Sequence, residues 1–271
     1  MSGTFKKSSL LVPLWQQRNL LWALTQRDIQ NRYSGSAAGA FWALLHPLAL
    51  LALYAVVFEA VFRVKVPHLS LGQPYVLFIA LSLWPWMAFQ EGVMRGTMAV
   101  QNNAALVKKV AFQHELLVYS AVLGSFLVHG FGFAVVLFVL GVAGFSIHWD
   151  GLMMTVVLMP ALLLLALALG LILGALQVFL RDVEQLLSQV MSVLFYATPI
   201  LFPMTMVPDW LSNIMKINPL MHITEPMRNA MLGQGATDWQ GVIWVWLGAL
   251  LALGLGRIFF LRLSPYFEDM V

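Results

Sequence analysis

The sequence predicts an all-α integral membrane protein, and its composition supplies the first two reasons. Of its 271 residues, 61% are hydrophobic and only 10% are charged, whereas soluble globular proteins carry about 25% charged residues. Too few polar side chains are present to cover so apolar a core in water, which argues against a soluble enzyme. The third reason is that long apolar stretches recur along the chain, as spanning helices require.

The first expected element is a helix on the membrane surface at residues 11–33. Apolar side chains such as Trp15 and Leu24 alternate in it with arginines, glutamines and asparagines. This mixture is typical of an amphipathic helix that lies in the membrane interface, and we place it on the cytoplasmic face. An extension of the first span is the alternative reading, but Gly35 and Gly39 interrupt the pattern.

Six apolar segments are predicted to cross the membrane: residues 41–62, 74–89, 116–145, 152–179, 186–202 and 242–261. Each approaches the roughly 20 residues that a spanning helix needs. The second segment contains Pro85, which makes its helix the least regular. The fifth contains Ser188, Gln189 and Pro199, so we expect it to face protein or a cavity.

Residues 203–240 lie between the fifth and sixth spans and are too polar to cross. Four prolines divide this stretch into short apolar pieces: Pro203, Pro208, Pro219 and Pro226. Short helices persist at membrane depth only when they are buried in protein or line a watery cavity. We therefore predict short re-entrant helices before the last span. No feature indicates a second soluble domain, so residues 1–271 are assigned to a single transmembrane domain.

The distribution of lysine and arginine predicts the orientation, because these residues accumulate in cytoplasmic connections. The side that holds both termini carries the larger group: Lys6, Lys7, Arg18, Arg27, Arg32, Arg95, Lys108, Lys109, Arg181, Arg257 and Arg262. The other side carries the smaller group: Arg63, Lys65, Lys216 and Arg228. Both termini are therefore expected in the cytoplasm, which agrees with an even number of spans.

Catalytic, cofactor and metal-binding patterns are absent from the sequence. It has no cysteine, no G-x-x-x-x-G-K-[ST] phosphate loop, no H-E-x-x-H and no G-x-S-x-G. The six histidines are scattered, and a lone one within a span, His129, is expected to be a packing residue. The formal charge of +3 fits attraction to anionic membrane lipid better than to nucleic acid. We therefore predict no enzymatic activity and no cofactor for this chain.

Two charged motifs stand out against the apolar background. Glu91 and Arg95 are four residues apart near the end of the second span, so on a helix they share a face and can pair. The sequence Arg181-Asp182-Val183-Glu184 closes the fourth span. Isolated charges at this depth are costly, so each motif is either a structural ion pair or part of a functional site.

Aromatic residues are abundant, with 18 Phe, 10 Trp and 6 Tyr. Interfacial anchoring explains many of them, and we assign Trp84, Trp86, Trp149, Trp239 and Trp244 to that role. Aromatic faces also stack on sugar rings, so another set is a candidate lining for a glycan channel. Its members are Phe41, Trp42, Tyr54, Phe58, Phe195, Tyr196 and Phe202.

An ordered series of motifs resembles the ABC-2-type permeases that export polysaccharides. The motifs are Arg27-Asp28, Arg32-Tyr33-Ser34-Gly35-Ser36, Gly39, Trp42, Leu45-His46-Pro47, Leu83-Trp84-Pro85-Trp86, Phe89, Glu91, Arg95, Asn102, Leu106-Val107-Lys108-Lys109-Val110, Phe112, Val178-Phe179-Leu180-Arg181-Asp182-Val183, Thr198-Pro199-Ile200, Pro203, Asn218-Pro219 and Arg228-Asn229-Ala230. They extend from about residue 20 to about residue 235. One departure is His114, where many members have arginine after an aromatic-proline pair.

The resemblance implies a half-transporter in which two copies of this chain form the channel. Two copies of a separate ATPase subunit, which holds ATP and Mg, would drive it, in keeping with the missing phosphate loop. In the family the amino-terminal helix and the first cytoplasmic loop dock on the ATPase. Carried over, the docking residues are Arg27, Asp28, Arg32, Asn102, Leu106, Lys108 and Lys109. Those assigned to the cytoplasmic gate are Glu91, Arg95, Arg181, Asp182 and Glu184.

The implied activity is export of an undecaprenyl-type lipid-linked polysaccharide across a bacterial inner membrane. O-antigen of lipopolysaccharide is the first assignment, with capsular polysaccharide or teichoic acid as the alternative. An exporter of small hydrophobic compounds is a further alternative, although such proteins usually have a large outer loop between the first two spans. An intramembrane enzyme would need a convergent His, Ser or Asp cluster within the spans, and the sequence shows none. A structural scaffold would not explain the re-entrant segment or the docking loop.

Overall fold

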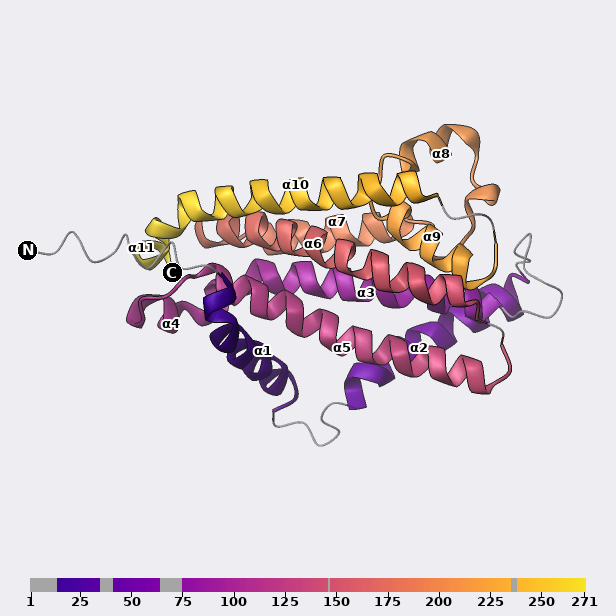
Figure 1. Ribbon diagram of the computed structural model, residues 1–271, viewed down its shortest axis with the longest axis horizontal. Helices are drawn as coiled ribbons and strands as arrows, with labels where there is room; N and C mark the ends of the chain where they lie inside the picture. Colours follow the sequence, from indigo (N-terminus) through magenta and orange to yellow (C-terminus); the bar gives the residue numbers. More distant parts are fainter. Residues whose placement is uncertain (1–13, 35–40, 64–74, 146, 235–237) are drawn as a thin grey trace, which may run out of the picture.

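The computed structural model describes residues 14–34, 41–63, 75–145, 147–234 and 238–271, and within these ranges every regular element is a helix. The longer helices are α1 (Arg18–Tyr33), α2 (Trp42–Ala55), α3 (Tyr75–Met98), α5 (Glu115–Val142), α6 (Trp149–Phe179), α7 (Val183–Tyr196), α9 (Met221–Met231) and α10 (Trp239–Leu263). The shorter helices are α4 (Ala104–Lys109), α8 (Asp209–Met215) and α11 (Phe267–Met270), and α2 continues as a π-helix over Val56–Val61. Single turns lie at Leu14–Gln17, Gln101–Asn103, Met204–Met206 and Ser264–Tyr266. In Figure 1, α3, α5, α6 and α10 run side by side along the long axis.

Five helical segments are long and apolar enough to cross a membrane. They are Leu44–Val61, Tyr75–Met98, Glu115–Val142, Trp149–Phe179 and Trp239–Met270. The chain is therefore a multi-pass membrane protein, as its composition predicts. The second predicted span, residues 74–89, ends too early, because α3 continues through Pro85 and past Glu91 to Met98.

The predicted fifth span at residues 186–202 is shorter than expected. Helix α7 (Val183–Tyr196) has 14 residues, which makes it about 21 Å long at 1.5 Å per residue. The helix ends because residues 197–202 form turns, in which the backbone N–H of Ile200 donates to the carbonyl of Thr198. By itself α7 does not reach across roughly 30 Å of hydrocarbon.

Helix α3 forms the centre of the bundle, with most of its side chains buried against α5, α6 and α2. Its contact with α6 depends on small residues, since a Cβ on Gly96 would lie 3.1 Å from the Cα of Gly170 and one on Gly174 would lie 2.9 Å from the Gly96 carbonyl oxygen. Such small residues allow membrane helices to approach closely. The position of α3 also corrects the assignment of Trp84 and Trp86, which are 1% and 2% exposed in the core and not interfacial anchors.

The two ends of the bundle carry different short elements (Figure 1). Helices α1, α4 and α11 lie at one end, where α1 packs against α5 and α4 contacts α11. Helices α8 and α9 lie at the opposite end. Apolar side chains occupy more than one face of α1: Leu21 and Leu24 pack against the core, whereas Leu20 and Trp22 are exposed.

Several expectations fall outside the described ranges. They concern residues 11–13 of the surface helix, residues 35–40, Lys6, Lys7, Lys65, and residues 235–237.

Candidate functional site

Charged side chains from three helices meet where α1 joins the bundle. The Arg32 side chain at the carboxyl end of α1 is only 5% exposed. Its guanidinium donates to Asp28 Oδ2 at 2.7 Å on the same helix and to Glu91 Oε1 at 2.8 Å on α3. It also donates to Ser125 Oγ at 3.0 Å and to the Ala121 carbonyl on α5 at 3.2 Å. One arginine thus fastens α1 to both α3 and α5.

Glu91 and Arg95 complete this cluster from α3. Glu91 Oε2 lies 2.7 Å from His129 Nε2 on α5, and Arg95 Nη2 donates to Asp28 Oδ1 at 2.9 Å. We call Asp28, Arg32, Glu91, Arg95 and His129 the charge network. Charged hydrogen bonds of this kind are among the stronger ones in proteins, so the network binds α1 to the core as one unit.

The close approach of α1 to α5 is permitted by Gly124. A Cβ at this position would lie 2.9 Å from both Arg32 Nη2 and Asp28 Oδ2. A larger residue would push the two charged groups away from α5. Burial also raises the pKa of the neighbouring Tyr33 phenol, so that group stays neutral beside the network.

The predicted Glu91–Arg95 ion pair is present, with an N–O distance of 4.0 Å, and both residues also have closer partners on neighbouring helices. His129 is not a simple packing residue, since it contacts Glu91. Asp28 and Arg32, assigned to ATPase docking, lie together with Glu91 and Arg95, assigned to the gate. Within the described ranges no cluster of three histidine or carboxylate side chains is arranged to hold a metal ion.

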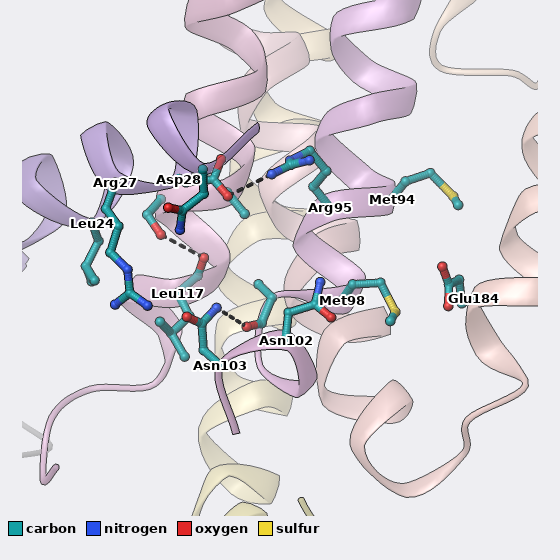
Figure 2. A pocket seen from close by; sticks show the side chains of 14 residues that line it. Leu24, Arg27, Asp28, Met94, Arg95, Met98, Asn102, Asn103, Leu117 and Glu184 are labelled. Atoms are coloured by element: carbon teal, nitrogen blue, oxygen red, sulfur yellow. Dashed lines mark hydrogen bonds and ion pairs between the residues drawn. The ribbon is translucent and has the colours of Figure 1, made fainter. Parts of the chain in front are cut away.

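A pocket of about 420 Å³ opens beside the network. In Figure 2, Arg27 and Asp28 approach it from α1, Arg95, Met98 and Asn102 lie across its middle, and Glu184 stands at the far side. The pocket therefore touches the surface helix, the start of the first connecting loop and the start of α7. Any movement of α1 relative to α7 changes its shape.

The turn between α6 and α7, whose residues 181, 182 and 184 were predicted to form the cytoplasmic gate, is held by a residue that sequence reasoning missed, Gln177 on α6. Its side-chain oxygen accepts from the backbone N–H of Glu184 at 2.8 Å, and its amide donates to Gln101 Oε1 at 3.0 Å and to the Arg181 carbonyl at 3.2 Å. The side chains of Arg181, Asp182 and Glu184 themselves are exposed. The signal available in the sequence was a lone glutamine in a 31-residue apolar helix.

The remaining residues predicted to dock on an ATPase lie at the same end of the molecule. Asn102, Lys108 and Lys109 are exposed, and Leu106 is half-buried. The two lysines occupy the last turn of α4, where the carbonyl groups at a helix carboxyl end favour cations. The short α4 thus presents a basic tip next to α11.

Four of the seven predicted channel aromatics gather in one cluster. The rings of Tyr54 on α2 and Phe195 on α7 stack with centroids 6.0 Å apart, and Phe58 and Tyr196 adjoin them. Trp86 on α3 joins at 5.7 Å from Phe195. Sequence reasoning placed Trp86 elsewhere because no pattern showed that α3 is central.

A cleft of about 370 Å³ lies beside these rings, between α2, α3 and α7. Its walls include Tyr54, Phe195 and Tyr196, and its polar groups include His46, Gln90 and Ser192. Gln90 also accepts a hydrogen bond from the Trp86 indole at 2.9 Å. The remaining predicted aromatics are not among the residues that line the cleft: Phe41, Trp42, Phe58 and Phe202.

At the opposite end, α9 is fastened to the turn after α7 by Arg228. This side chain is 1% exposed and donates to Ser82 Oγ on α3 at 3.2 Å and to the Pro199 carbonyl. Its guanidinium also lies 3.9 Å from the centre of the Phe78 ring, a favourable cation–π geometry. Burial lowers the pKa of Arg228 to about 10, which leaves it charged at neutral pH.

Asn218 strengthens the same junction. Its amide donates to the Ala197 carbonyl at 3.1 Å and to Thr198 Oγ1 at 2.9 Å, and its oxygen accepts from the backbone N–H of Leu220 at 3.0 Å. Tyr75 donates to the carbonyl of Leu201 in this turn. The family-like motifs around residues 198–200, 218–219 and 228–230 therefore meet in space.

A further ion pair that sequence reasoning missed joins α5 to α10. The Glu115 side chain is fully buried and receives two hydrogen bonds of 2.9 Å from Arg257. A paired, bidentate arrangement of this kind satisfies both charges. It fixes the two helices where the basic tip of α4 and the carboxyl end of the chain lie.

Similarity to known proteins extends over the elements that build these sites. Residues 19–232 match the family described as ABC-2 type transporter. The O-antigen export system permease protein RfbA of Myxococcus xanthus is 31% identical over 79% of this chain and 80% of its own length. A protein of the same name from Klebsiella pneumoniae is 25% identical over 93% and 95% of the two chains, and the polysialic acid transport protein KpsM of Escherichia coli is 22% identical over 78% and 80%. The chain belongs to the ABC-2 type transporter family.

Proposed function

We propose that this chain is the transmembrane subunit of an ATP-driven exporter of lipid-linked polysaccharide, with O-antigen as its first assignment. The observation that carries the proposal is the aromatic cleft between α2, α3 and α7, which pairs stacking surfaces with His46, Gln90 and Ser192. Relatives named for O-antigen export support the same cargo. The relative named for polysialic acid transport favours capsular polysaccharide as the second candidate.

A glycan that crosses the bilayer needs hydrogen-bonding partners for its hydroxyl groups, because burying them away from water without partners costs free energy. The cleft offers aromatic faces for weak stacking and hydrogen-bonding groups, so a glycan can advance without binding tightly at any one position. In one copy the cleft lies at the protein surface, and a second copy facing it would enclose a channel. We therefore propose that the functional transmembrane unit is a homodimer.

Six crossings are supported by the direction of the helices. Helix α6 ends at the end of the bundle that carries α11, whereas α10 begins at the end that carries α9 (Figure 1). The chain between them must return, and we propose that α7 with the turns at residues 197–202 makes this sixth crossing. An even number of crossings and the lysine and arginine distribution support the proposal that both termini lie in the cytoplasm, and the relatives named for O-antigen export support a bacterial inner membrane.

Coupling to ATP hydrolysis would begin at the end that carries α1 and α4. Two copies of a separate ATPase subunit, which binds ATP and Mg, would dock against Arg27, Asn102, Leu106 and the lysines of α4. Movement of α1 would then pass through the charge network to α3 and α5 and would reshape the pocket that ends at Glu184. We also propose that basic residues of this region receive the pyrophosphate of the lipid carrier. Helices α8 and α9 would form the outer mouth as re-entrant helices.

The docking assignment predicts the effect of reversing charge on α4. The double substitution Lys108→Glu and Lys109→Glu is expected to reduce copurification of the ATPase and to lower export, because both lysines are exposed at the basic tip. Lys216→Glu, at the opposite end, is the matched control and should leave copurification unchanged. Retention of the ATPase at wild-type levels by the double variant would contradict the docking site.

The channel assignment predicts a different outcome for the aromatic cleft. Tyr54→Ala with Phe195→Ala removes two stacked rings, so ATP-dependent uptake of lipid-linked polysaccharide into inverted vesicles should fall while the ATPase remains bound. Phe138→Ala, which removes an exposed ring on α5, is the control. Equal uptake by the two variants would exclude this cleft as the glycan path.

A further inference from the structure

A second cleft of about 550 Å³ lies far from the charge network, between α6, α9 and the beginning of α10. Leu165, Pro219, Trp244 and Val245 contribute its apolar lining, and His222 and Asp238 are the ionisable groups in its wall. Its size falls within the range of small-molecule binding sites. Neither the aromatic cleft nor the α9 junction shares a lining residue with it.

The cleft lies along a membrane-spanning helix and not in a soluble region. Its α10 residues extend from Asp238 to Ala249, which is about three helical turns from the start of the span. The large apolar side chains on the adjoining surface of α10 are exposed, among them Ile243, Leu247 and Leu251. Because the surroundings of such a surface are lipid, the apolar part of the cleft faces hydrocarbon and its polar end faces the headgroup region.

None of the described residues fills the space beside Gly248. A Cβ built on Gly248 meets no atom within 4 Å, whereas one on Gly241 would lie 2.6 Å from Asp238 Oδ2. Gly241 therefore serves the cap of α10, but Gly248 serves no internal packing contact of this kind. The missing side chain of Gly248 leaves space in the apolar part of the cleft, and a hydrocarbon chain can occupy that space.

The two ionisable groups at the polar end both offer hydrogen-bond acceptors. His222 Nε2 lies 2.8 Å from the Lys216 carbonyl, so this nitrogen is the donor and, in the neutral imidazole, Nδ1 is an acceptor. Asp238 is a carboxylate that accepts one bond from the backbone N–H of Gly241 at 3.1 Å and has further acceptor capacity. A headgroup that donates N–H bonds and carries positive charge matches this pair better than an anionic one.

We propose that this cleft binds a phosphatidylethanolamine molecule of the outer leaflet. One acyl chain lies along Leu165, Trp244 and Gly248, and the ammonium group bonds to Asp238 and His222. The inference depends on membrane insertion and not on the identity of the exported cargo. The bound lipid would fill the gap between α9 and α10 and thereby support the outer helices.

Photocrosslinking in lipid nanodiscs tests the acyl-chain site. Phosphatidylethanolamine with a diazirine in its acyl chain is expected to label the Trp244–Ala249 stretch of α10 in the full-length protein. Gly248→Phe adds a ring to the cleft at a position whose Cβ would meet no described atom within 4 Å, and it should reduce this labelling to background. Gly254→Phe is the matched control, since Gly254 also has open space around its Cβ but does not line the cleft, and it should retain labelling.

A comparison of two lipids in the same experiment tests the headgroup assignment. Phosphatidylglycerol with the same diazirine should label the stretch several-fold less, and Asp238→Asn, which keeps an acceptor for the helix cap, should remove that difference. Unchanged labelling in Gly248→Phe would overturn the site. Equal labelling by both lipids, or stronger labelling by a diazirine polyprenyl phosphate, would overturn phosphatidylethanolamine as the occupant.

Discussion

Replacing Arg32 with methionine is expected to abolish export and to lower the stability of the protein. The substitution leaves the carboxylates of Asp28 and Glu91 without their shared arginine. Loss of one partner from a buried ion pair costs roughly 3–5 kcal/mol. These carboxylates are 22% and 38% exposed, so solvent screening reduces the expected loss to about 2 kcal/mol. Thermal unfolding in detergent measures the stability, and surface polysaccharide measures export.

Arg18→Met is the matched control for Arg32→Met. Arg18 also lies on α1, but its contacts are local, with the Trp15 carbonyl at 3.3 Å and the Trp15 ring. This variant should unfold like the wild type. Arg32→Lys should give an intermediate result, because lysine keeps the charge but cannot reproduce the forked contacts of arginine. If Arg32→Met and Arg18→Met export equally well, the charge network does not transmit motion from α1.

Replacing Arg228 with methionine is expected to disable the opposite end of the molecule. Methionine cannot donate to Ser82 or to the Pro199 carbonyl, and an unpaired buried acceptor costs about 1–3 kcal/mol. The turn after α7 would separate from α9, so export should be lost. ATPase copurification should remain, because the α1 and α4 end is unaffected.

Two further variants separate a specific role for Arg228 from general damage. Asn218→Ala removes two hydrogen bonds from the segment just before α9 to the same turn and should give the same pattern at smaller amplitude. Arg228→Lys retains the charge over Phe78 and should recover part of the export. Loss of ATPase copurification in Arg228→Met would show that the defect is global unfolding and not a local one.

Composition and helix length predicted most of the fold, because both depend on local sequence. The apolar runs in α5, α6 and α10 are long enough to identify without tertiary information. The predicted end of α3 was wrong because Glu91 and Arg95 were taken as signs of a boundary, whereas the helix continues past them and pairs them, half-buried, with residues of α1 and α5. Helix α7 was predicted too long because the apolar residues continue past the turn at Thr198 and Pro199.

The candidate sites were predictable as residue types but not as partners. Glu91 and Arg95 could be identified because a charged residue in an apolar span carries a free-energy cost. Their partners could not, since Arg32 is 59 positions and His129 is 38 positions from Glu91 in the sequence. Only the packing of α1, α3 and α5 brings these side chains together. One local signal was available: Ser125 and His129 are four residues apart in α5 and therefore share a helix face.

Depletion of this chain in its native cell is the direct test of polysaccharide export. Lipid-linked polysaccharide would be extracted and separated into inner-membrane and surface fractions. We expect full-length polymer to accumulate on the lipid carrier inside and to disappear from the surface, and its sugar composition would identify the cargo. Normal surface polysaccharide together with new sensitivity to small hydrophobic compounds would contradict polysaccharide export and favour a small-molecule exporter.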